Sequence, residues 1–252
     1  MKTFNAKVET NKIIEFVRDY YQKQHVSGVI LGISGGKDSA VVAALFVKAL
    51  GKENVIGVML PCYSKEEDKI DARLISDYYG FELINFDLTT IFDTFQEEVA
   101  MLGKFTEQET ENSNINLKPR LRMASLYYLA SLYSSIRKQT YLVAGTSNKC
   151  ERYVGYFTKG GDSVYDIALI ADFTVDEVIK IGECLQVPDK VLYKKPNDGL
   201  SNKTDEDKLG VKYSEIASFI EDEALVETEI AHKIKKLHAD NFHKFYTPTY
   251  RR

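Results

Sequence analysis

The sequence predicts an α/β fold in which a doubly wound, mostly parallel sheet carries helices on both faces, with lid loops and helices toward the C-terminus. Short apolar runs typical of buried strands alternate with longer segments of helical spacing through at least four units. A glycine-rich turn joins the first apolar run to the helix after it. Because ligands of such sheets bind at the carboxyl ends of strands, we expect the functional site in the loops there.

The composition is that of one globular domain covering residues 1–252. A net charge of -4 argues against a nucleic-acid partner. The three cysteines have no metal-ligand spacing, and their odd number argues against a disulfide framework. No apolar run reaches the roughly 18 residues of a membrane span, and the polar N-terminus lacks a signal peptide. We therefore expect a cytoplasmic protein without a membrane partner.

The first half of the chain contains seven predicted elements. They are a helix over 13–21, a strand over 29–33, a helix over 40–50, a strand over 54–60, a helix from 67, a strand over 81–86 and a helix over 88–102. Ser64 and Glu67 stand at the spacing of a capping box, which predicts the start of the third helix. That helix would place Ile70, Leu74 and Tyr78 on one face.

The second half is less regular. We expect a surface loop over 103–117, a helix over 119–138, a strand over 140–144, a helix from 174 to 185, an ordered or gated loop over 188–210, and helices over 213–221 and 225–237. The helix over 119–138 is expected to turn four apolar side chains inward: Leu121, Tyr128, Leu132 and Ile136. Thr174 and Glu177 form a second capping-box pair.

The glycine-rich turn between the first strand and its helix is Gly32-Ile33-Ser34-Gly35-Gly36-Lys37-Asp38-Ser39. Unpaired backbone N–H groups at such a helix start attract phosphate. Leu31 and Asp38 occupy positions where a Walker A loop needs glycine and Ser or Thr, and Ser34 breaks the dinucleotide fingerprint. The amides and the serine hydroxyls could hold pyrophosphate, and the Asp38 carboxylate suits Mg²⁺. The alternatives are a turn without a ligand and an aspartate that only compensates the helix dipole.

Ser-Gly-Gly-x-Asp-Ser resembles the pyrophosphate loop of the ATP pyrophosphatases, which split ATP into AMP and pyrophosphate. Two later segments, Gly145–Glu151 and Gly155–Asp162, narrow the resemblance to the NAD synthetases. Three further segments are similar to motifs of that family: Leu117–Met123, Asp205–Gly210 and His243-Lys244. The resemblance implies an adenine nucleotide alpha hydrolase-like fold and an ATP-dependent amidation of deamido-NAD⁺ by ammonia. The products would be NAD⁺, AMP and pyrophosphate, formed through an adenylated carboxylate.

The resemblance also implies roles for individual residues. ATP would be bound by Gly32, Ile33, Ser34, Gly35, Gly36, Lys37, Asp38, Ser39, Thr146 and Asn197. Deamido-NAD⁺ would be bound by Arg120, Lys159, Asp166, His243 and Lys244. Asp38 and Glu151 would ligate Mg²⁺, and Asp162 would position ammonium or take its proton. A homodimer is implied as well. No glutaminase domain is expected, because the chain starts about 30 residues before the phosphate loop.

The sequence departs from the family pattern at two positions. Val175 stands where the family has a lysine near the ATP phosphates, and Asn197 stands where it has Thr or Ser. Four lysines could replace the missing cation: Lys180, Lys194, Lys195 and Lys203. The site acids and cations could instead be solvated surface charges. Two other functions stay open, namely another ATP pyrophosphatase such as a tRNA-modifying enzyme, and a nucleotide-binding module with little or no turnover.

Overall fold

A computed structural model describes residues 4–194 and 204–250 of the chain. Its sheet has five parallel strands in the order β3-β2-β1-β4-β5. The strands are β1 Gly28–Gly32, β2 Val55–Met59, β3 Glu82–Asn85, β4 Tyr141–Gly145 and β5 Ile167–Ala168. The chain moves outward in one direction through β2 and β3, then returns to the other side of β1 with β4. The strand order therefore switches beside β1, and the glycine-rich turn follows β1 directly.

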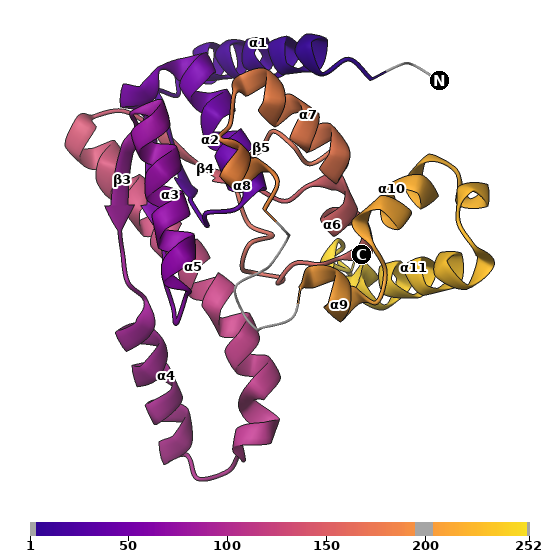
Figure 1. Ribbon diagram of the computed structural model, residues 1–252. Helices are drawn as coiled ribbons and strands as arrows, with labels where there is room; N and C mark the ends of the chain where they lie inside the picture. The colour runs from indigo at the N-terminus through magenta and orange to yellow at the C-terminus, as the bar shows by residue number, and fades with distance from the viewer. Residues whose placement is uncertain (1–3, 195–203, 251–252) are drawn as a thin grey trace.

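Helices cover both faces of the sheet, as predicted (Figure 1). The helices are α1 Ala6–Gln24, α2 Lys37–Leu50, α3 Glu66–Tyr79, α4 Thr89–Met101, α5 Glu107–Arg137, α6 Lys149–Val154, α7 Val175–Leu185, α8 Asp189–Leu192, α9 Asp205–Leu209, α10 Tyr213–Glu221 and α11 Thr228–Asn241. Three short 3-10 turns are η1 Lys52–Asn54, η2 Glu223–Leu225 and η3 Phe242–Lys244. Among them, α2 is the most completely enclosed, since seven consecutive residues from 40 to 46 are buried.

Successive residues of β1 point into two different cores. Val29 and Leu31 pack with α1, α2, α3, α7 and α8, whereas Ile30 packs with α4 and α5. This alternation follows from the period of two along a strand, and burial on both faces explains the continuous apolar run. A third cluster joins α6 and α7 to α10 and α11, which lie away from the strands in Figure 1.

The region 103–117 was expected to be a surface loop, but most of it is helical. α5 begins at Glu107 and continues through Pro119 to Arg137. Thr106 and Glu109 form the capping box that starts it, with the Thr106 side chain accepting from the Glu109 N–H. This capping pair was the missed signal, and Pro119, taken as the helix start, instead lies inside the helix at the loss of one backbone donor.

The inward face predicted for α5 was also wrong. Tyr128 and Ile136 are each 68% exposed and Leu132 is 41% exposed, whereas Leu129 and Ala130 are buried. Only Leu121 of the predicted set packs against the core. Apolar residues recur at every fourth position on both sides of this helix. Successive side chains of an α-helix point in directions that differ by about 100°. Spacing alone therefore did not distinguish the two faces.

The start of α3 differs from the prediction too. Lys65 occupies the N-cap position without a side-chain cap, and the Ser64 hydroxyl instead accepts from the Cys62 N–H at 3.3 Å. The first turn contains Glu66, Glu67 and Asp68, whose charges favour a helix N-terminus. Of the face predicted for this helix, Ile70 and Tyr78 are exposed, whereas Leu74 packs against the core. In contrast, the capping box of Thr174 and Glu177 is confirmed at the start of α7.

Candidate active site at the carboxyl end of the sheet

The turn between β1 and α2 has its conformation fixed by Gly35 and two serine hydroxyls. Gly35 has a φ of +76°, and a Cβ there would lie 2.3 Å from the backbone oxygen of Asp68 in α3. The Ser34 and Ser39 hydroxyl oxygens lie 3.2 Å apart, and Ser39 Oγ donates to the Gly36 carbonyl at 3.0 Å. Both predicted hydroxyl ligands thus hold the turn itself.

α2 starts without a side-chain cap, because its N-cap residue is Gly36. The first N–H groups of a helix have no partner within the helix, and an uncapped start leaves them to a ligand. Together with the positive end of the helix dipole, they form a site for an anion such as phosphate. The predicted loop, from Gly32 to Ser39, therefore ends at an uncapped helix start, which is the kind of feature that binds phosphate.

Asp38 lies in the first turn of α2 and Glu151 in the first turn of α6, and the two carboxylates are close enough to interact electrostatically. Burial, and then the nearby Asp38 charge, raise the pKa of the Glu151 carboxyl well above its usual range. The Lys37 side chain is 5% exposed, and its Nζ lies 3.4 Å from Asp38 Oδ2. Asp38 Oδ1 is buried without a hydrogen-bond partner. An oxygen in this state, beside a second carboxylate, fits the ligand set of a divalent cation.

Glu151 is held in place by the start of its own helix. The Asn148 N–H donates to Glu151 Oε2 at 3.0 Å, and Asn148 Oδ1 accepts from the Cys150 and Glu151 N–H groups. Within the part of the chain that the structure describes, no group of three or more His, Cys, Asp or Glu could hold a metal ion. A cation here would take two carboxylates and complete its shell with water and phosphate, which is usual for Mg²⁺.

Asp162 lies within the loop over residues 155–166, which joins α6 to β5. The Thr158 N–H donates to Asp162 Oδ1 at 2.8 Å, and the Thr158 hydroxyl donates to Asn116 Oδ1 at 2.9 Å. Neighbouring protein atoms partly desolvate the Asp162 carboxyl and thereby raise its pKa, although the residue as a whole remains accessible to solvent. A solvent-accessible carboxyl group with a raised pKa suits proton transfer.

The residues predicted to bind deamido-NAD⁺ divide into two groups. Arg120 donates to the Lys159 carbonyl at 3.3 Å, Lys159 Nζ donates to the His243 carbonyl at 2.7 Å, and Lys244 Nζ donates to the Gly155 and Phe157 carbonyls. These four residues are thus linked around the Asp162 loop. Asp166 lies apart, because its carboxylate accepts from Tyr127 Oη and from the Val143 N–H of β4.

The remaining predicted site residues include some that the structure describes and some that lie outside the described residues. Thr146 directly follows β4 and is partly buried, whereas Asn197 lies outside the described residues, as do Lys195 and Lys203. Val175 is buried in the cluster of α6, α7, α10 and α11. Lys194 pairs with Asp68 and Asp71, and Lys180 lies over the Phe4 ring. Lys37, which belongs to the predicted phosphate loop, is itself a buried cation.

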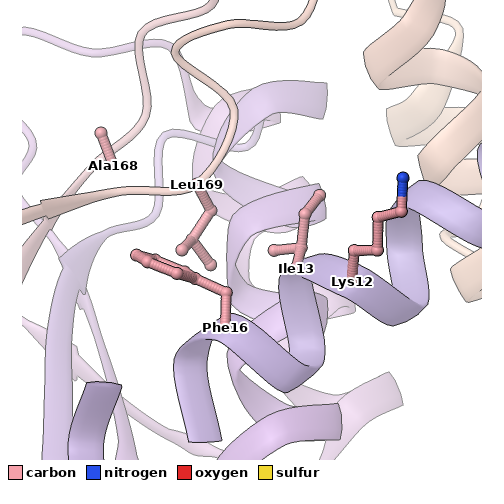
Figure 2. A pocket seen from close by; sticks show the side chains of 5 residues that line it. All are labelled: Lys12, Ile13, Phe16, Ala168 and Leu169. Atoms are coloured by element: carbon pink, nitrogen blue, oxygen red, sulfur yellow. The ribbon is translucent and has the colours of Figure 1, made fainter. Parts of the chain in front are cut away.

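A separate hollow of about 280 Å³ lies between α1 and β5. Figure 2 shows its lining, with Phe16, Ile13 and Leu169 around the space and Lys12 at one end. The Lys12 ammonium already pairs with Glu9 at 2.8 Å. Such an apolar lining lacks the converging polar groups that a nucleotide needs, and none of the predicted site residues belongs to it.

Two residues that organise the site were not predicted to be part of it. Asn148 caps α6, and its spacing to Glu151 is a capping-box pattern that was available in the sequence. Thr158 orients Asp162 through its backbone N–H, which no side-chain pattern could indicate. Over residues 4–194 and 204–250, none of the helices is both long and apolar enough to cross a bilayer.

Known proteins resemble this chain over nearly its whole length. The family model described as NAD synthase matches residues 9–248. The NH3-dependent NAD(+) synthetase of Carboxydothermus hydrogenoformans is 38% identical over 218 residues, which cover 86% of each chain. The enzyme of the same name from Alkaliphilus oremlandii is 36% identical over 251 residues, covering 98% of this chain and 97% of the relative.

Solved structures agree with the sequence relatives. The NMN synthetase of Francisella tularensis has a TM-score of 0.87 and 31% identity, over 98% of this chain and 99% of that one. The NH3-dependent NAD synthetase of Campylobacter jejuni, solved with a nitrate ion, has a TM-score of 0.78 and 26% identity, over 99% and 100%. Fold, site geometry and relatives lead to one conclusion. The chain belongs to the NAD synthase family.

Proposed function

We propose that this protein makes NAD⁺ by amidating deamido-NAD⁺ with ammonia, using ATP and Mg²⁺. The observation that carries the proposal is the uncapped start of α2, whose first turn contains Asp38, together with the electrostatic interaction between the Asp38 and Glu151 carboxylates. This pairing of an anion site with an acidic pair is what a metal–polyphosphate complex needs. The curated relatives named NH3-dependent NAD(+) synthetase support the same reaction.

The phosphate loop binds the leaving group of the first step. The N–H groups at the start of α2 hold the β- and γ-phosphates, and Lys37 adds a positive charge beside them. Bound by Asp38 and Glu151, Mg²⁺ supplies Lewis-acid stabilisation of the phosphate charge. One carboxylate oxygen of the nicotinate attacks the α-phosphorus, the bond to the bridging oxygen breaks, and pyrophosphate leaves. Thr146, the residue after β4, is proposed to contact the nucleotide.

The second step transfers the acyl group to ammonia. The nitrogen lone pair attacks the acyl carbon of the adenylate, the bond from that carbon to the AMP oxygen breaks, and AMP leaves. The nitrogen gives up one proton in this step. Asp162 is proposed as its acceptor, because its carboxyl has a raised pKa and is oriented by the Thr158 N–H. Arg120, Lys159, Asp166, His243 and Lys244 are proposed to bind the dinucleotide.

One assay distinguishes this function from its alternatives. Purified protein should form NAD⁺, AMP and pyrophosphate only when ATP, deamido-NAD⁺, Mg²⁺ and ammonia are all present. ATP consumption without deamido-NAD⁺ would overturn the proposal. RNA-dependent release of AMP would favour a tRNA-modifying enzyme, and tight nucleotide binding without turnover over hours would favour a binding module.

A mononucleotide substrate is a second candidate. The NMN synthetase structure is more similar to this chain, with a TM-score of 0.87, than the Campylobacter jejuni NAD synthetase at 0.78. The two substrates share the nicotinate carboxylate and differ in the adenylate half of the dinucleotide. The test compares kcat/KM for nicotinate mononucleotide with kcat/KM for deamido-NAD⁺ at saturating ATP and ammonia. A higher value for the mononucleotide would replace deamido-NAD⁺ as the proposed substrate.

A homodimer is proposed from the exposed side of α5. Tyr128, Leu132 and Ile136 repeat at every fourth position and form an apolar stripe on this helix. Figure 1 shows α4 and α5 extending together beyond the sheet. Such a contiguous apolar surface marks an interface, and the family resemblance points to a second copy of the chain. Light scattering should give twice the chain mass, and Tyr128→Glu with Ile136→Glu should give the single mass.

The location of the protein in the cell and the source of its nitrogen are two further proposals. The thiols of Cys62, Cys150 and Cys184 are all free, which suits the reducing cytoplasm. We propose a single domain that takes ammonia from solution or from a partner. Supplying glutamine in place of ammonia should then give no NAD⁺ with the purified chain.

A further inference from the structure

Buried polar atoms without a hydrogen-bond partner are concentrated near the proposed cation site. Among the residues that the structure describes, six side chains contain such an atom, and three of these atoms are Asp38 Oδ1, Asn148 Nδ2 and Tyr213 Oη. Asn148 caps the helix that contains Glu151, and both Asp38 and Tyr213 are close enough to Glu151 to interact electrostatically. Because a buried polar group without a partner costs free energy, this concentration points to a polar ligand.

Tyr213 is the first residue of α10 and is held by backbone contacts to two other helices. Its N–H donates to Glu206 Oε1 of α9 at 2.9 Å, and its carbonyl accepts from Cys150 Sγ of α6 at 3.8 Å. Cys150 directly precedes Glu151 in the sequence. Tyr213 is 3% exposed and packs in the cluster that joins α6 and α7 to α10 and α11. The packing of these helices therefore fixes the position of the hydroxyl group.

The charges near the Tyr213 hydroxyl are mainly negative. Burial, followed by the charges of Glu151 and Asp205, raises the pKa of this hydroxyl, so it stays protonated and can both donate and accept. Asp205 is itself buried, with 4% of its surface exposed. Glu151 interacts with the carboxylates of Asp38 and Asp205 and with the ammonium of Lys37. An excess of buried negative charge of this kind is stabilised by a bound cation.

We infer that Tyr213 is a positioning residue of the cation site, and that its hydroxyl hydrogen-bonds a water ligand of the cation held by Asp38 and Glu151. The inference rests on the proposed function, which assigns Mg²⁺ to these two carboxylates. Mg²⁺ usually keeps several of its waters when a protein binds it, and partners outside the ligand shell orient those ligands. A tyrosine hydroxyl can accept a hydrogen bond from such a water without adding a charge.

One variant and one matched control test the inference. Tyr213→Phe removes the hydroxyl and keeps the ring that packs in the cluster. The control is Tyr21→Phe, because Tyr21 is also 3% exposed and its hydroxyl is likewise buried without a partner in the described part of the chain. Tyr21 lies in α1 and belongs to a different core cluster from Tyr213. The two variants therefore make the same chemical change at equal burial, and only one of them lies near the acidic pair.

The probe is Mn²⁺, which resembles Mg²⁺ in preferring oxygen ligands in octahedral geometry. Each protein is titrated with Mn²⁺ in the presence of α,β-methylene ATP, whose bridging carbon prevents the loss of pyrophosphate. The enhancement of water-proton relaxation reports the Mn²⁺ that is held on the slowly tumbling protein. Tyr213→Phe should raise the Kd for Mn²⁺ by about tenfold or more, which is usual when a partner of a metal ligand is lost. Tyr21→Phe should stay within about twofold of the wild type.

Thermal unfolding without metal separates this role from a structural one. The thermal midpoint of Tyr213→Phe should be no lower than that of the wild type, because phenylalanine leaves no buried hydroxyl without a partner. Added Mn²⁺ with α,β-methylene ATP should then raise the midpoint of Tyr213→Phe less than that of the wild type or of Tyr21→Phe. An unchanged Kd for Mn²⁺ in Tyr213→Phe, an equal rise in Tyr21→Phe, or a lowered midpoint without metal would overturn the inference.

The proposed function and the role of Tyr213 fail in different ways. If the wild-type protein binds no Mn²⁺ with α,β-methylene ATP, the proposed cation site fails and the role of Tyr213 fails with it. If the wild type binds Mn²⁺ but forms no NAD⁺ from the four reactants, the proposed amidation fails alone. If the wild type does both and Tyr213→Phe binds Mn²⁺ equally tightly, only the role of Tyr213 fails.

Discussion

Replacing Gly35 by alanine should disable the phosphate loop while the protein stays folded. A left-handed backbone costs a non-glycine residue about 1–2 kcal/mol. The added Cβ would lie 2.3 Å from the Asp68 oxygen, whereas an ordinary contact is at least 3.4 Å. Because this neighbour is backbone and has no rotamer to change, the loop must move by about 1 Å. A shift of that size in a binding group reduces catalysis by about a hundredfold.

The assay for Gly35→Ala combines calorimetric titration with ATP and Mg²⁺, the rate of NAD⁺ formation, and urea unfolding. Gly103→Ala is the matched control, because Gly103 has a φ of +61° and open space around the Cβ position. Both variants carry the cost of the left-handed backbone, and Gly35→Ala should lose additional stability through its contact with Asp68; only Gly35→Ala should lose ATP affinity and turnover. Unchanged ATP binding in Gly35→Ala, or an equal loss in Gly103→Ala, would refute the reasoning.

The other predictions concern the acidic residues near the loop. Asp38→Ala should reduce turnover by about a thousandfold, because a bound metal supplies several kcal/mol of charge stabilisation, with an unchanged circular dichroism spectrum; wild-type rates would remove Asp38 as a ligand. Asp71 is fully buried between Lys190 and Lys194, so Asp71→Asn should lower the free energy of unfolding in urea by about 3–5 kcal/mol. Burial raises the pKa of Asp71, but its ion pairs with both lysines outweigh burial and lower it. The stabilisation should therefore be present above the unfolded-state pKa of about 3.9 and disappear as the pH falls through the folded-state value, a loss that Asp71→Asn should not show.

Much of the sheet and of the candidate phosphate site could be predicted from local signals. The run from Val29 to Leu31 is apolar throughout because both faces of β1 are buried. The glycines after it mark a turn that only glycine can make, as the contact of Gly35 with Asp68 shows. β5 was missed because two residues are too few to form a pattern. The start of α5 was predicted at Pro119 instead of Glu107, because the proline was taken as the first helical residue and the capping pair of Thr106 and Glu109 was overlooked.

The arrangement around Asp162 depends on contacts that have no sequence signal. Lys159 and Lys244 bind backbone carbonyls, and such acceptors are present at every residue. The approach of Asn241 to Gly155 joins distant segments through a packing contact. Tyr128, Leu132 and Ile136 of α5 were assigned to the core although they are exposed. Helical spacing predicts which residues share a face of a helix, but it does not predict whether that face is buried.

The most direct test of the central claim follows the oxygen of the substrate carboxylate. Deamido-NAD⁺ labelled with 18O in both carboxylate oxygens is incubated with ATP, Mg²⁺, ammonia and the protein, and the AMP is analysed by mass spectrometry. Attack of the carboxylate on the α-phosphorus predicts one 18O atom in each AMP and unlabelled pyrophosphate. Unlabelled AMP, or ADP as the nucleotide product, would contradict the account.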